Sequence, residues 1–397
     1  MEMSLKGIRP TFVIVEVDNI IHNLCELTRL TAEETKIMAV VKADAYGHGA
    51  LEVSKACCEN GVDYLSVAIL EEGIFLREHG IQKPILILGA TFSDRAYDVI
   101  KYDLTQGVSS IEIVNALSRA AKDLKKTALV HVKIETGMNR LGARPGIDLT
   151  ALIKVLADNR EYVKVEGVFS HFAKADAEDK TYAMAQYEVF ARGVEEMQTA
   201  GFNNIVKHIS NSAAIIDLPK AHIDMVRQGI SLYGYYPSQE VRHEINLRPA
   251  LSWITHIAHI KRIAAGSFIG YGCTYVTKRE SVIATLPVGY ADGYPRLLSN
   301  CGSVIIRGRK APIVGRVCMD QLMVDVTEVE AAEVRDEAIL IGRQGGETIS
   351  ADDLANQTGT ISYEILTGIS ARVPRVFKYK GDIRIEDRLN GWKKQLK

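Results

Sequence analysis

Residues 36–50 read KIMAVVKADAYGHGA, an aliphatic run that ends at Lys42 and continues into small and polar residues. An uninterrupted run of this kind is typical of a parallel strand that is buried on both faces. The run therefore delivers the Lys42 ammonium to the rim of a core, where desolvation favours the neutral amine. Because the neutral amine is the form that makes a Schiff base with an aldehyde, we consider Lys42 a candidate covalent cofactor anchor. A strand-end lysine that simply reaches solvent is the alternative.

The same pattern repeats from about residue 36 to 235: a short aliphatic run, a polar or glycine-rich break, and a segment of helical character. The runs lie at 37–41, 64–69, 85–88, 129–134, 163–169, 205–209 and 223–226, with a weaker one at 107–108, and helices are expected at 50–59, 71–79 and 182–199. This alternation favours an eight-stranded (β/α) barrel over an open sheet. No GxGxxG follows the first run, so a dinucleotide-binding sheet has no positive support.

After about residue 240 the sequence changes to longer β-rich stretches with tight glycine turns, at 253–263, 281–288, 302–326 and 338–341. Residues 307–310 are predicted to form a hairpin turn, and the strand-like segment 11–17 could pair with either part of the chain. We therefore predict an α/β fold: a TIM-like (β/α)8 barrel over residues 12–243, followed by a mostly antiparallel β domain over 244–397 together with 1–11.

Composition limits the possible partners. The chain has 397 residues, with 48 lysines and arginines against 49 acidic residues, so no net field would draw it to nucleic acid or to an anionic membrane. Its six cysteines form no CxxC pair, which fits a reducing compartment and argues against a cysteine-bound metal. No apolar stretch reaches the length of a membrane span. We expect a cytoplasmic protein with a small-molecule substrate.

Catalytic groups of a (β/α) barrel lie at the carboxyl ends of its strands, and polar residues follow several of the predicted strands here. They are Lys42 and Tyr46, the segment 135–140, Ser170 and His171, the segment 210–212, and the segment 227–230. Ser212 and Gly229 are candidates for holding a phosphate, although a capped helix start and an ordinary turn are the alternatives.

Two further residues stand out. Lys133 lies within an aliphatic run, where a buried ammonium would be costly; a carbamate formed with carbon dioxide could pair with Arg140, and a lysine whose end reaches solvent is the alternative. Tyr271 lies between two glycines, where a loop could project its phenol. A phenol needs a cationic or hydrogen-bonded neighbour to act as a base, and His171 and Arg227 are candidates. A surface aromatic is the alternative for Tyr271.

Taken together, these segments resemble the alanine racemase family over nearly the whole chain. The matching motifs are VKADAYGHG at 41–49, HVKIETGMNRLG at 131–142, SHFA at 170–173, NSAA at 211–214, VRQGI at 226–230, GYG at 270–272, LPVGYADG at 286–293, VGRVCMD at 314–320 and ISYE at 361–364. Residues 9–23 match more loosely. The resemblance implies a barrel plus a β domain, pyridoxal 5'-phosphate as cofactor, and interconversion of L- and D-alanine.

The resemblance also implies roles for individual residues. Lys42 would carry the cofactor and act as one acid/base, and Tyr271 of the partner subunit in a homodimer would act as the other, on the opposite face of the cofactor. The remaining assignments fall into groups. The phosphate would be held by Tyr46, Ser212, Gly229, Ile230 and Tyr363. Arg227 would face the pyridine nitrogen, and His171 would tune Tyr271. The substrate carboxylate would be held by Arg140 and the Met319 amide, with Lys133 orienting Arg140. Cys318 and Asp320 would be supporting residues, and Arg296 and Arg316 would line the access channel. Tyr363 at the pocket wall would favour a side chain as small as that of alanine.

Three other functions are alternatives to this one. An amidohydrolase-like metalloenzyme also uses a carbamylated lysine, but its first-strand His-x-His is absent, and His256 and His259 lie in the predicted β domain. A cofactor-carrying barrel without turnover would resemble the first domain only. A decarboxylase on the same scaffold would require different groups at the positions of Arg140 and Tyr271.

Overall fold

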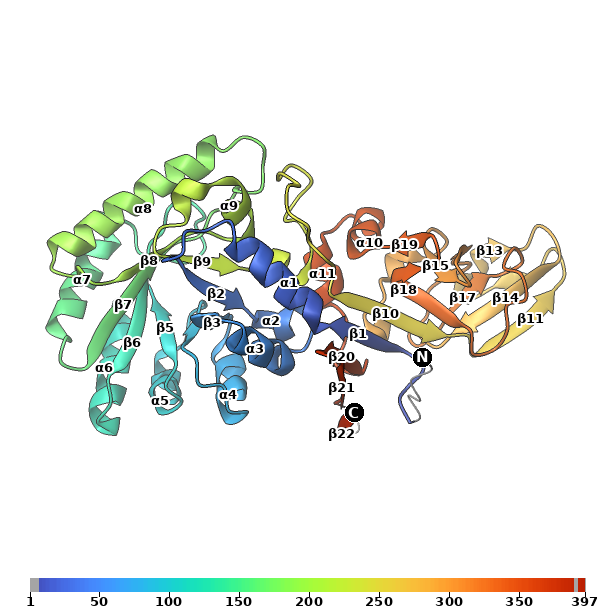
Figure 1. Cartoon of the computed structure of the whole chain (residues 1–397), viewed down its shortest axis with the longest axis horizontal. Helices are drawn as coiled ribbons and strands as arrows, with labels where there is room; N and C mark the ends of the chain where they lie inside the picture. Colours follow the sequence, from blue (N-terminus) through green and yellow to red (C-terminus); the bar gives the residue numbers. More distant parts are fainter. Residues whose placement is uncertain (1–6, 389–391, 397) are drawn as a thin grey trace. The chain divides into compact units, whose positions relative to one another are not determined.

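The computed structural model describes residues 7–388 and the backbone of 392–396. It divides into two compact units, which are described separately: residues 19–45 and 50–249 form one, and residues up to 18, 46–49 and those from 250 onward form the other. We call them the barrel unit and the β unit (Figure 1). Residues 1–6 of the predicted β-domain segment lie outside the described residues, and the predicted domain limits stay a prediction.

The barrel unit is built on eight parallel strands in the order β8-β7-β6-β5-β4-β3-β2-β9. Their bounds are β2 (Lys36–Val40), β3 (Tyr64–Val67), β4 (Ile85–Ile87), β5 (Thr105–Val108), β6 (Ala128–Lys133), β7 (Val163–Phe169), β8 (Val206–His208) and β9 (Met225–Gln228). Backbone hydrogen bonds from the Asp224 amide to the Lys207 carbonyl (3.3 Å) and from the Arg227 amide to the Ser210 carbonyl (3.1 Å) link the two ends of this sheet. The predicted barrel is therefore confirmed, including the strand expected from the weak run at 107–108.

Helices follow the strands along the chain and lie outside them in Figure 1. They are α1 (Val17–Thr28), α2 (Lys42–Tyr46), α3 (Ala50–Glu59), α4 (Leu70–Glu78), α5 (Ala96–Lys101), α6 (Ile111–Leu124), α7 (Asp148–Asp158), α8 (Thr181–Thr199) and α9 (Ser212–Asp217), with the 3-10 turns η1 (Ser93–Arg95), η2 (Pro219–Ala221) and η3 (Ile230–Tyr233). Helix α6 shows why they pack as they do: it buries Val114, Leu117 and Ala121, whose spacing places them on one face. Inside the barrel, Met38, Leu86 and Met225 form a packed cluster.

The β unit contains a nine-stranded sheet whose main path is β16-β15-β18-β10-β1-β20-β21-β22. Its strands are β1 (Phe12–Glu16), β10 (Leu251–His256), β15 (Ser303–Ile306), β16 (Arg309–Pro312), β18 (Glu337–Gln344), β19 (Glu347–Ile349), β20 (Arg375–Tyr379), β21 (Asp382–Asp387) and β22 (Trp392–Leu396). Strand β1 pairs antiparallel with β10 and parallel with β20, so residues 12–16 belong to this sheet and not to the barrel sheet. The backbone amide and carbonyl groups of β1 find their hydrogen-bond partners on β10 and β20.

Two smaller sheets complete the β unit: β11 (His259–Ile263) with β14 (Ser281–Leu286) and β17 (Leu322–Asp325), and β12 (Phe268–Ile269) with β13 (Tyr275–Val276). Its helical segments are α10 (Ala351–Thr358), α11 (Ser362–Thr367), η4 (Tyr271–Cys273), η5 (Tyr290–Asp292) and η6 (Arg296–Leu298). The predicted hairpin turn is confirmed between β15 and β16, where Arg307 and Gly308 both have positive φ, as a type I′ turn requires. Within the described part of the chain, no helix has the length and apolar character needed to cross a membrane.

Candidate active site

The peptide after Lys42 has an unusual backbone. Ala43, Asp44, Ala45 and Tyr46 all have positive φ values, between 52° and 55°, so α2 is a left-handed turn made without glycine. Each such residue costs roughly 1–2 kcal/mol, which persists only where the surrounding structure fixes the conformation. A hydrogen bond from the Ala45 amide to the Val41 carbonyl (2.9 Å) closes the turn. Lys42 is therefore attached to a constrained segment at the carboxyl end of β2.

The electrostatic surroundings of Lys42 favour its neutral form. Burial lowers the pKa of the Lys42 ammonium, and the positive charges of Arg140 and Arg227 lower it further, whereas Glu72 opposes the shift. A lysine with a lowered pKa offers more free amine at neutral pH. This is the property predicted from the sequence for a covalent anchor.

Lys133 lies close to the same group of charges. It is the last residue of β6, not a mid-strand residue as its run suggested, and it is 7% exposed. Its Nζ lies 5.2 Å from the ring centroid of Phe169. Burial lowers the pKa of Lys133 to about 8, with Arg140 and Arg227 contributing in the same direction. Arg140 itself is exposed on the loop that follows β6.

Arg227 is a buried cation with several hydrogen-bond partners. It is 3% exposed, and its guanidinium donates to His208 Nδ1 (2.9 Å), His171 Nδ1 (3.0 Å) and the carbonyls of Ser170 (2.7 Å) and Ile209 (2.9 Å). Burial lowers the pKa of Arg227 to about 9, so the group is still charged at neutral pH. Because a guanidinium can only donate, both histidines must accept through Nδ1.

This requirement fixes a hydrogen-bond chain that the sequence analysis missed. His208 accepts at Nδ1, so its proton is on Nε2, which donates to Nδ1 of His131 at 2.9 Å. His131 is fully buried, and its Nε2 has no hydrogen-bond partner among the described residues. Burial lowers the pKa of His131 to about 3 and that of His208 well below its ordinary value. The available sequence signal was that His131 and His208 each lie within an apolar run.

The loops after β8 and β9 meet at Ser212. Its Oγ accepts the backbone N–H of Gly229 (3.0 Å) and of Ser231 (3.3 Å), and Ser212 and Ile230 are both buried. The structure thus brings Ser212, Gly229 and Ile230 together, as the two candidate phosphate loops require.

In the β unit, Tyr271 opens η4 between Gly270 (φ 70°) and Gly272 (φ 72°). It is 72% exposed and lines a cavity of about 510 Å³ together with Phe268, Cys318 and Met323, among others. A Cβ added to Gly272 would lie 3.2 Å from the guanidinium carbon of Arg316, so Arg316 packs against Gly272, the residue after Tyr271. The glycines therefore allow both the projected phenol and the close arginine.

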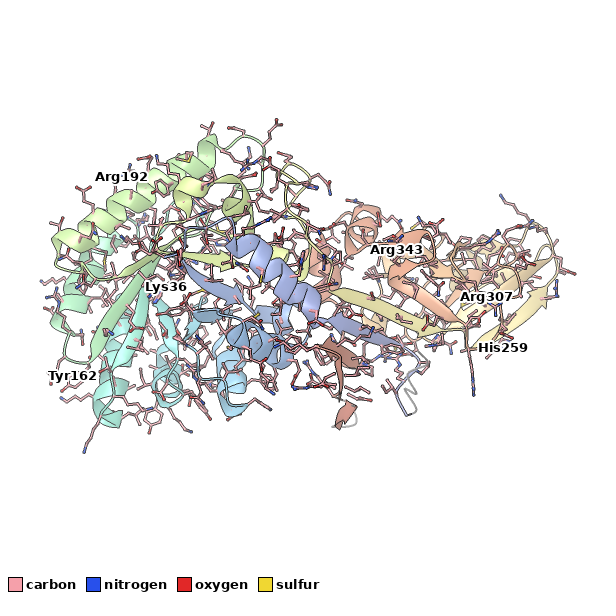
Figure 2. The ribbon with its side chains drawn as sticks, viewed as in Figure 1. Lys36, Tyr162, Arg192, His259, Arg307 and Arg343 are labelled. Carbon is pink, nitrogen blue, oxygen red and sulfur yellow. The ribbon has the colours of Figure 1, made fainter. Side chains whose placement is uncertain are left out.

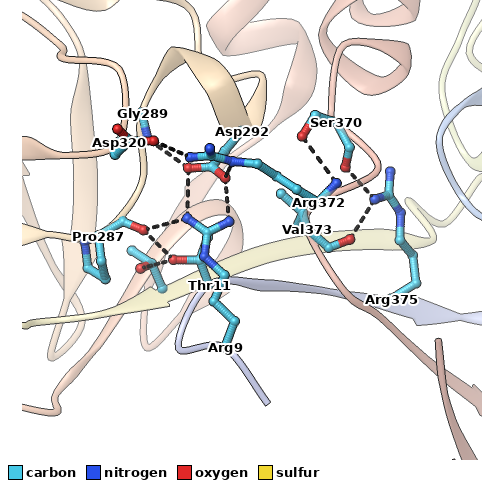
Figure 3. Close-up of polar contacts among 11 residues, drawn as sticks. Arg9, Thr11, Pro287, Gly289, Asp292, Asp320, Ser370, Arg372, Val373 and Arg375 are labelled. Atoms are coloured by element: carbon cyan, nitrogen blue, oxygen red, sulfur yellow. Dashed lines mark hydrogen bonds and ion pairs between the residues drawn. The ribbon is translucent and has the colours of Figure 1, made fainter. Parts of the chain in front are cut away.

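The segment Cys318–Asp320 is held from two sides. The carbonyls of Cys318 and Met319 accept the amides of Tyr290 (3.1 Å) and Ala291 (2.9 Å). Since the carbonyl and N–H of one trans peptide point in opposite directions, the Met319 N–H is directed away from η5. Arg372 bonds both Asp292 (2.7 Å) and Asp320 (2.6 Å), and Arg9 forms a second ion pair with Asp292, which is fully buried (Figure 3).

The other predicted residues of the β unit are more dispersed. The rings of Tyr46 and Tyr363 lie 6.0 Å apart, and burial raises the pKa of Tyr46. Arg296 is exposed on η6. Of the two histidines weighed as metal ligands, His256 bonds the Pro10 carbonyl through Nδ1 at 2.8 Å, and His259 is exposed and projects outward (Figure 2).

Comparisons with known proteins cover almost the entire chain. Residues 15–237 match the family described as "Alanine racemase, N-terminal domain", and residues 250–377 match "Alanine racemase, C-terminal domain". Alanine racemase 2 of Caldanaerobacter subterraneus subsp. tengcongensis is 49% identical over 376 residues, which cover 95% of this chain and 97% of the relative.

Solved structures agree with these matches. The alanine racemase of Bacillus anthracis with bound L-Ala-P is 38% identical, with a TM-score of 0.92 and coverage of 96% and 98% of the two chains. The alanine racemase of Bartonella henselae with covalently bound pyridoxal phosphate is 28% identical, with a TM-score of 0.83 and coverage of 93% and 99%.

Proposed function

The chain belongs to the alanine racemase family, a family of isomerases, and on this premise we propose that it interconverts L- and D-alanine with pyridoxal phosphate as cofactor. The observation that carries the proposal is the Lys42 amine, held on a constrained turn at a barrel strand end with its pKa lowered by burial and by two arginines. The relatives are matched over nearly their whole length, which supports transferring the activity of the complete protein.

The candidate site residues fit this cofactor. Arg140 and Arg227 lower the pKa of both Lys42 and Lys133, so these four side chains form a cationic group suited to a phosphate and a carboxylate. Lys42 would bond the cofactor aldehyde, and Ser212, Gly229, Ile230, Tyr46 and Tyr363 would hold the phosphate. Arg227 can donate a hydrogen bond to the pyridine nitrogen but cannot readily protonate it.

When bound, pyridoxal phosphate supplies the conjugated system that accepts electron density from the substrate Cα. The chain's own residues then move the protons. The Lys42 amine would take or give a proton on one face of the substrate, and the Tyr271 phenol of a partner subunit would do so on the other. The high exposure of Tyr271 within one chain supports a role that a second copy completes. His171, which accepts from Arg227, would tune the phenol.

We also propose which groups bind the substrate. The Met319 amide, which points away from η5, and the Arg140 guanidinium would hold the alanine carboxylate, with Cys318 and Asp320 keeping the Met319 peptide in place. A carbamate on Lys133 would orient Arg140. The lowered pKa of Lys133 supports this proposal, because only the neutral amine adds carbon dioxide. Arg296 and Arg316 would line the access channel, and Tyr363 would limit the size of the substrate side chain.

The activity is tested with purified protein and pyridoxal phosphate. The protein should be yellow and should interconvert the alanine enantiomers in chiral analysis, and Lys42→Ala should abolish both properties. In Tyr271→Phe, hydrogen exchange at Cα should fall far more for one enantiomer than for the other. Tyr162→Phe is the matched control, because Tyr162 lies at the amino ends of the barrel strands, opposite to the ends that carry the candidate site. Equal loss for both enantiomers would exclude the two-base assignment.

The shared active site has a separate test, which is coexpression of Lys42→Ala with Tyr271→Phe. Each variant alone should be inactive or nearly so, but a mixed dimer would contain one site with both native groups. Statistical mixing should then restore about a quarter of the wild-type activity, because half of the dimers are mixed and each has one intact site. No recovery in a mixture shown to contain mixed dimers would mean that both groups act within one chain.

A further inference from the structure

We propose that Glu72 is a positioning residue for Lys42: its carboxylate pins the peptide that carries the lysine and keeps a negative charge beside the amine. The inference rests on the proposed function, in which Lys42 is the cofactor anchor. Glu72 was not among the residues that the sequence analysis singled out.

The carboxylate of Glu72 joins the segments that follow two neighbouring strands. Glu72 lies in the first turn of α4, after β3, and its Oε2 accepts the amides of Ala68 (2.7 Å) and Ile69 (3.3 Å). Its Oε1 accepts the amide of Ala43 at 2.6 Å, on the segment after β2. One side chain therefore bonds both its own helix start and the peptide between Lys42 and Ala43.

Capping α4 accounts for only one of the two carboxylate oxygens. A glutamate at the third helical position commonly reaches back to the N-cap amide, and Oε2 already does so. The bond from Oε1 to Ala43 contributes nothing to α4. It instead satisfies the first amide of the left-handed turn, where φ of Ala43 is 52°. A charged acceptor makes a stronger hydrogen bond than a neutral one, which suits a strained backbone.

Charge gives a second, independent effect. Arg140 and Arg227 lower the pKa of Lys42, and Glu72 is the acidic group that raises it. Without the Glu72 charge, the Lys42 nitrogen would lose its protons at a lower pH. Glu72 therefore keeps burial and the two arginines from lowering the pKa of Lys42 further.

The variant Glu72→Gln separates these effects from simple packing, because an amide has a similar shape but only one acceptor atom and no charge. Either Ala43 or the start of α4 then loses its acceptor. Glu71→Gln is the matched control, since Glu71 lies on the same helical turn and is exposed in an ion pair with Arg95 at 2.9 Å. Glu72→Asp is the second variant, which retains the charge but is shorter by one methylene group.

The first measurement uses the protein without cofactor: hydrogen–deuterium exchange followed by mass spectrometry on peptides covering residues 42–46, with residues 70–78 followed alongside to monitor α4. Glu72→Gln should exchange at Ala43 at least tenfold faster than wild type, and Glu71→Gln should not. The second measurement follows the visible absorbance of the cofactor-loaded protein against pH. Its midpoint should move to lower pH in Glu72→Gln and return toward wild type in Glu72→Asp.

Racemisation kinetics complete the test: kcat should fall about tenfold in Glu72→Gln while KM for alanine stays within about twofold. The proposal is overturned if exchange at 42–46 and the pH midpoint match those of Glu71→Gln, since Glu72 would then be a helix cap only. It is also overturned if the residues 70–78 lose protection while 42–46 keep theirs. If the protein does not racemise alanine, the proposed function fails, but the exchange experiment still decides the role of Glu72.

Discussion

Gly167 faces His131 across the β6–β7 pair, and replacing it by alanine should disturb the hydrogen-bond chain that ends at Arg227. The register of β6 on β7 shifts after Val130, so that Val130 pairs with Val165 but His131 pairs with Gly167. A Cβ on Gly167 would lie 2.6 Å from both Cε1 and Nδ1 of the His131 ring. The ring would have to move by about 0.8 Å to reach an ordinary contact of 3.4 Å.

The cost of this movement can be worked out from the surroundings of the ring. His131 is fully buried, so it has no solvent to move into, and a shift of that size in its 2.9 Å bond with His208 exceeds hydrogen-bond reach. Overpacking costs about 1–3 kcal/mol, and a buried donor left without an acceptor costs about 1–3 kcal/mol. We therefore expect Gly167→Ala to lower the free energy of unfolding by about 2–6 kcal/mol, the sum of these two costs.

Urea unfolding of the cofactor-free protein, followed by far-UV circular dichroism, measures this effect. Tryptophan fluorescence would not suit, because Trp253 and Trp392 both lie in the β unit. Gly346→Ala is the control, since nothing lies within 4 Å of its added Cβ and its φ is not positive. In a His131→Ala background the cost of Gly167→Ala should largely disappear. A Gly167→Ala protein as stable as Gly346→Ala, or an undiminished cost in that background, would refute the reasoning.

Three further predictions concern buried charges. The pKa of His131 in the folded protein, about 3, lies below the ordinary 6.5, so the stability that its neutral form contributes is present above pH 6.5 and is lost as pH falls toward 3, by about 1.4 kcal/mol per pH unit. Urea unfolding at pH 7 and pH 5 should therefore show a smaller loss of stability in His131→Phe than in the wild type, and equal losses would contradict this prediction. Because the pKa of Lys133 is about 8, the fraction of its neutral amine increases from pH 7 to 9. The carbonyl NMR signal of a carbamate formed with ¹³C-bicarbonate should therefore increase over that range and be absent in Lys133→Arg. A signal of equal size in Lys133→Arg would exclude the carbamate at this residue. Asp292→Asn removes the buried partner of Arg9 and Arg372 and should cost about 3–5 kcal/mol, measured by thermal unfolding; a loss below 1 kcal/mol would show that the ion pairs contribute little.

The barrel could be predicted from the sequence because parallel strands buried on both faces need continuous aliphatic runs. Even the run at 107–108 corresponds to β5, since Thr105, Gln106 and Val108 are all buried there. The position of β1 could not be deduced in the same way. Its FVIVE sequence suits either unit, and only its pairing with β10 and β20 decides the matter. Local pattern identifies a strand, whereas its neighbours depend on contacts far apart in the chain.

The candidate site shows the same division. Residues that follow strands, such as Lys42 and His171, could be found because barrel topology brings strand ends together. Glu72 is one turn into a helix and looks like an ordinary capping carboxylate, so its bond to Ala43 could not be expected from spacing. His131 and His208 face each other because of a register shift and a glycine that only the folded strands reveal.

The direction of that histidine chain bears on the proposed chemistry. Arg227 donates to Nδ1 of both His171 and His208, and His208 donates in turn to His131, so each acceptor nitrogen is occupied by a proton from its neighbour. The pKa of all three imidazoles is lowered by burial first and then by the charge of Arg227. None of them would thus be protonated at neutral pH, and a neutral imidazole bonded in this way is a poor proton donor. Within the barrel unit this favours the amine of Lys42 as the group that returns a proton to the substrate.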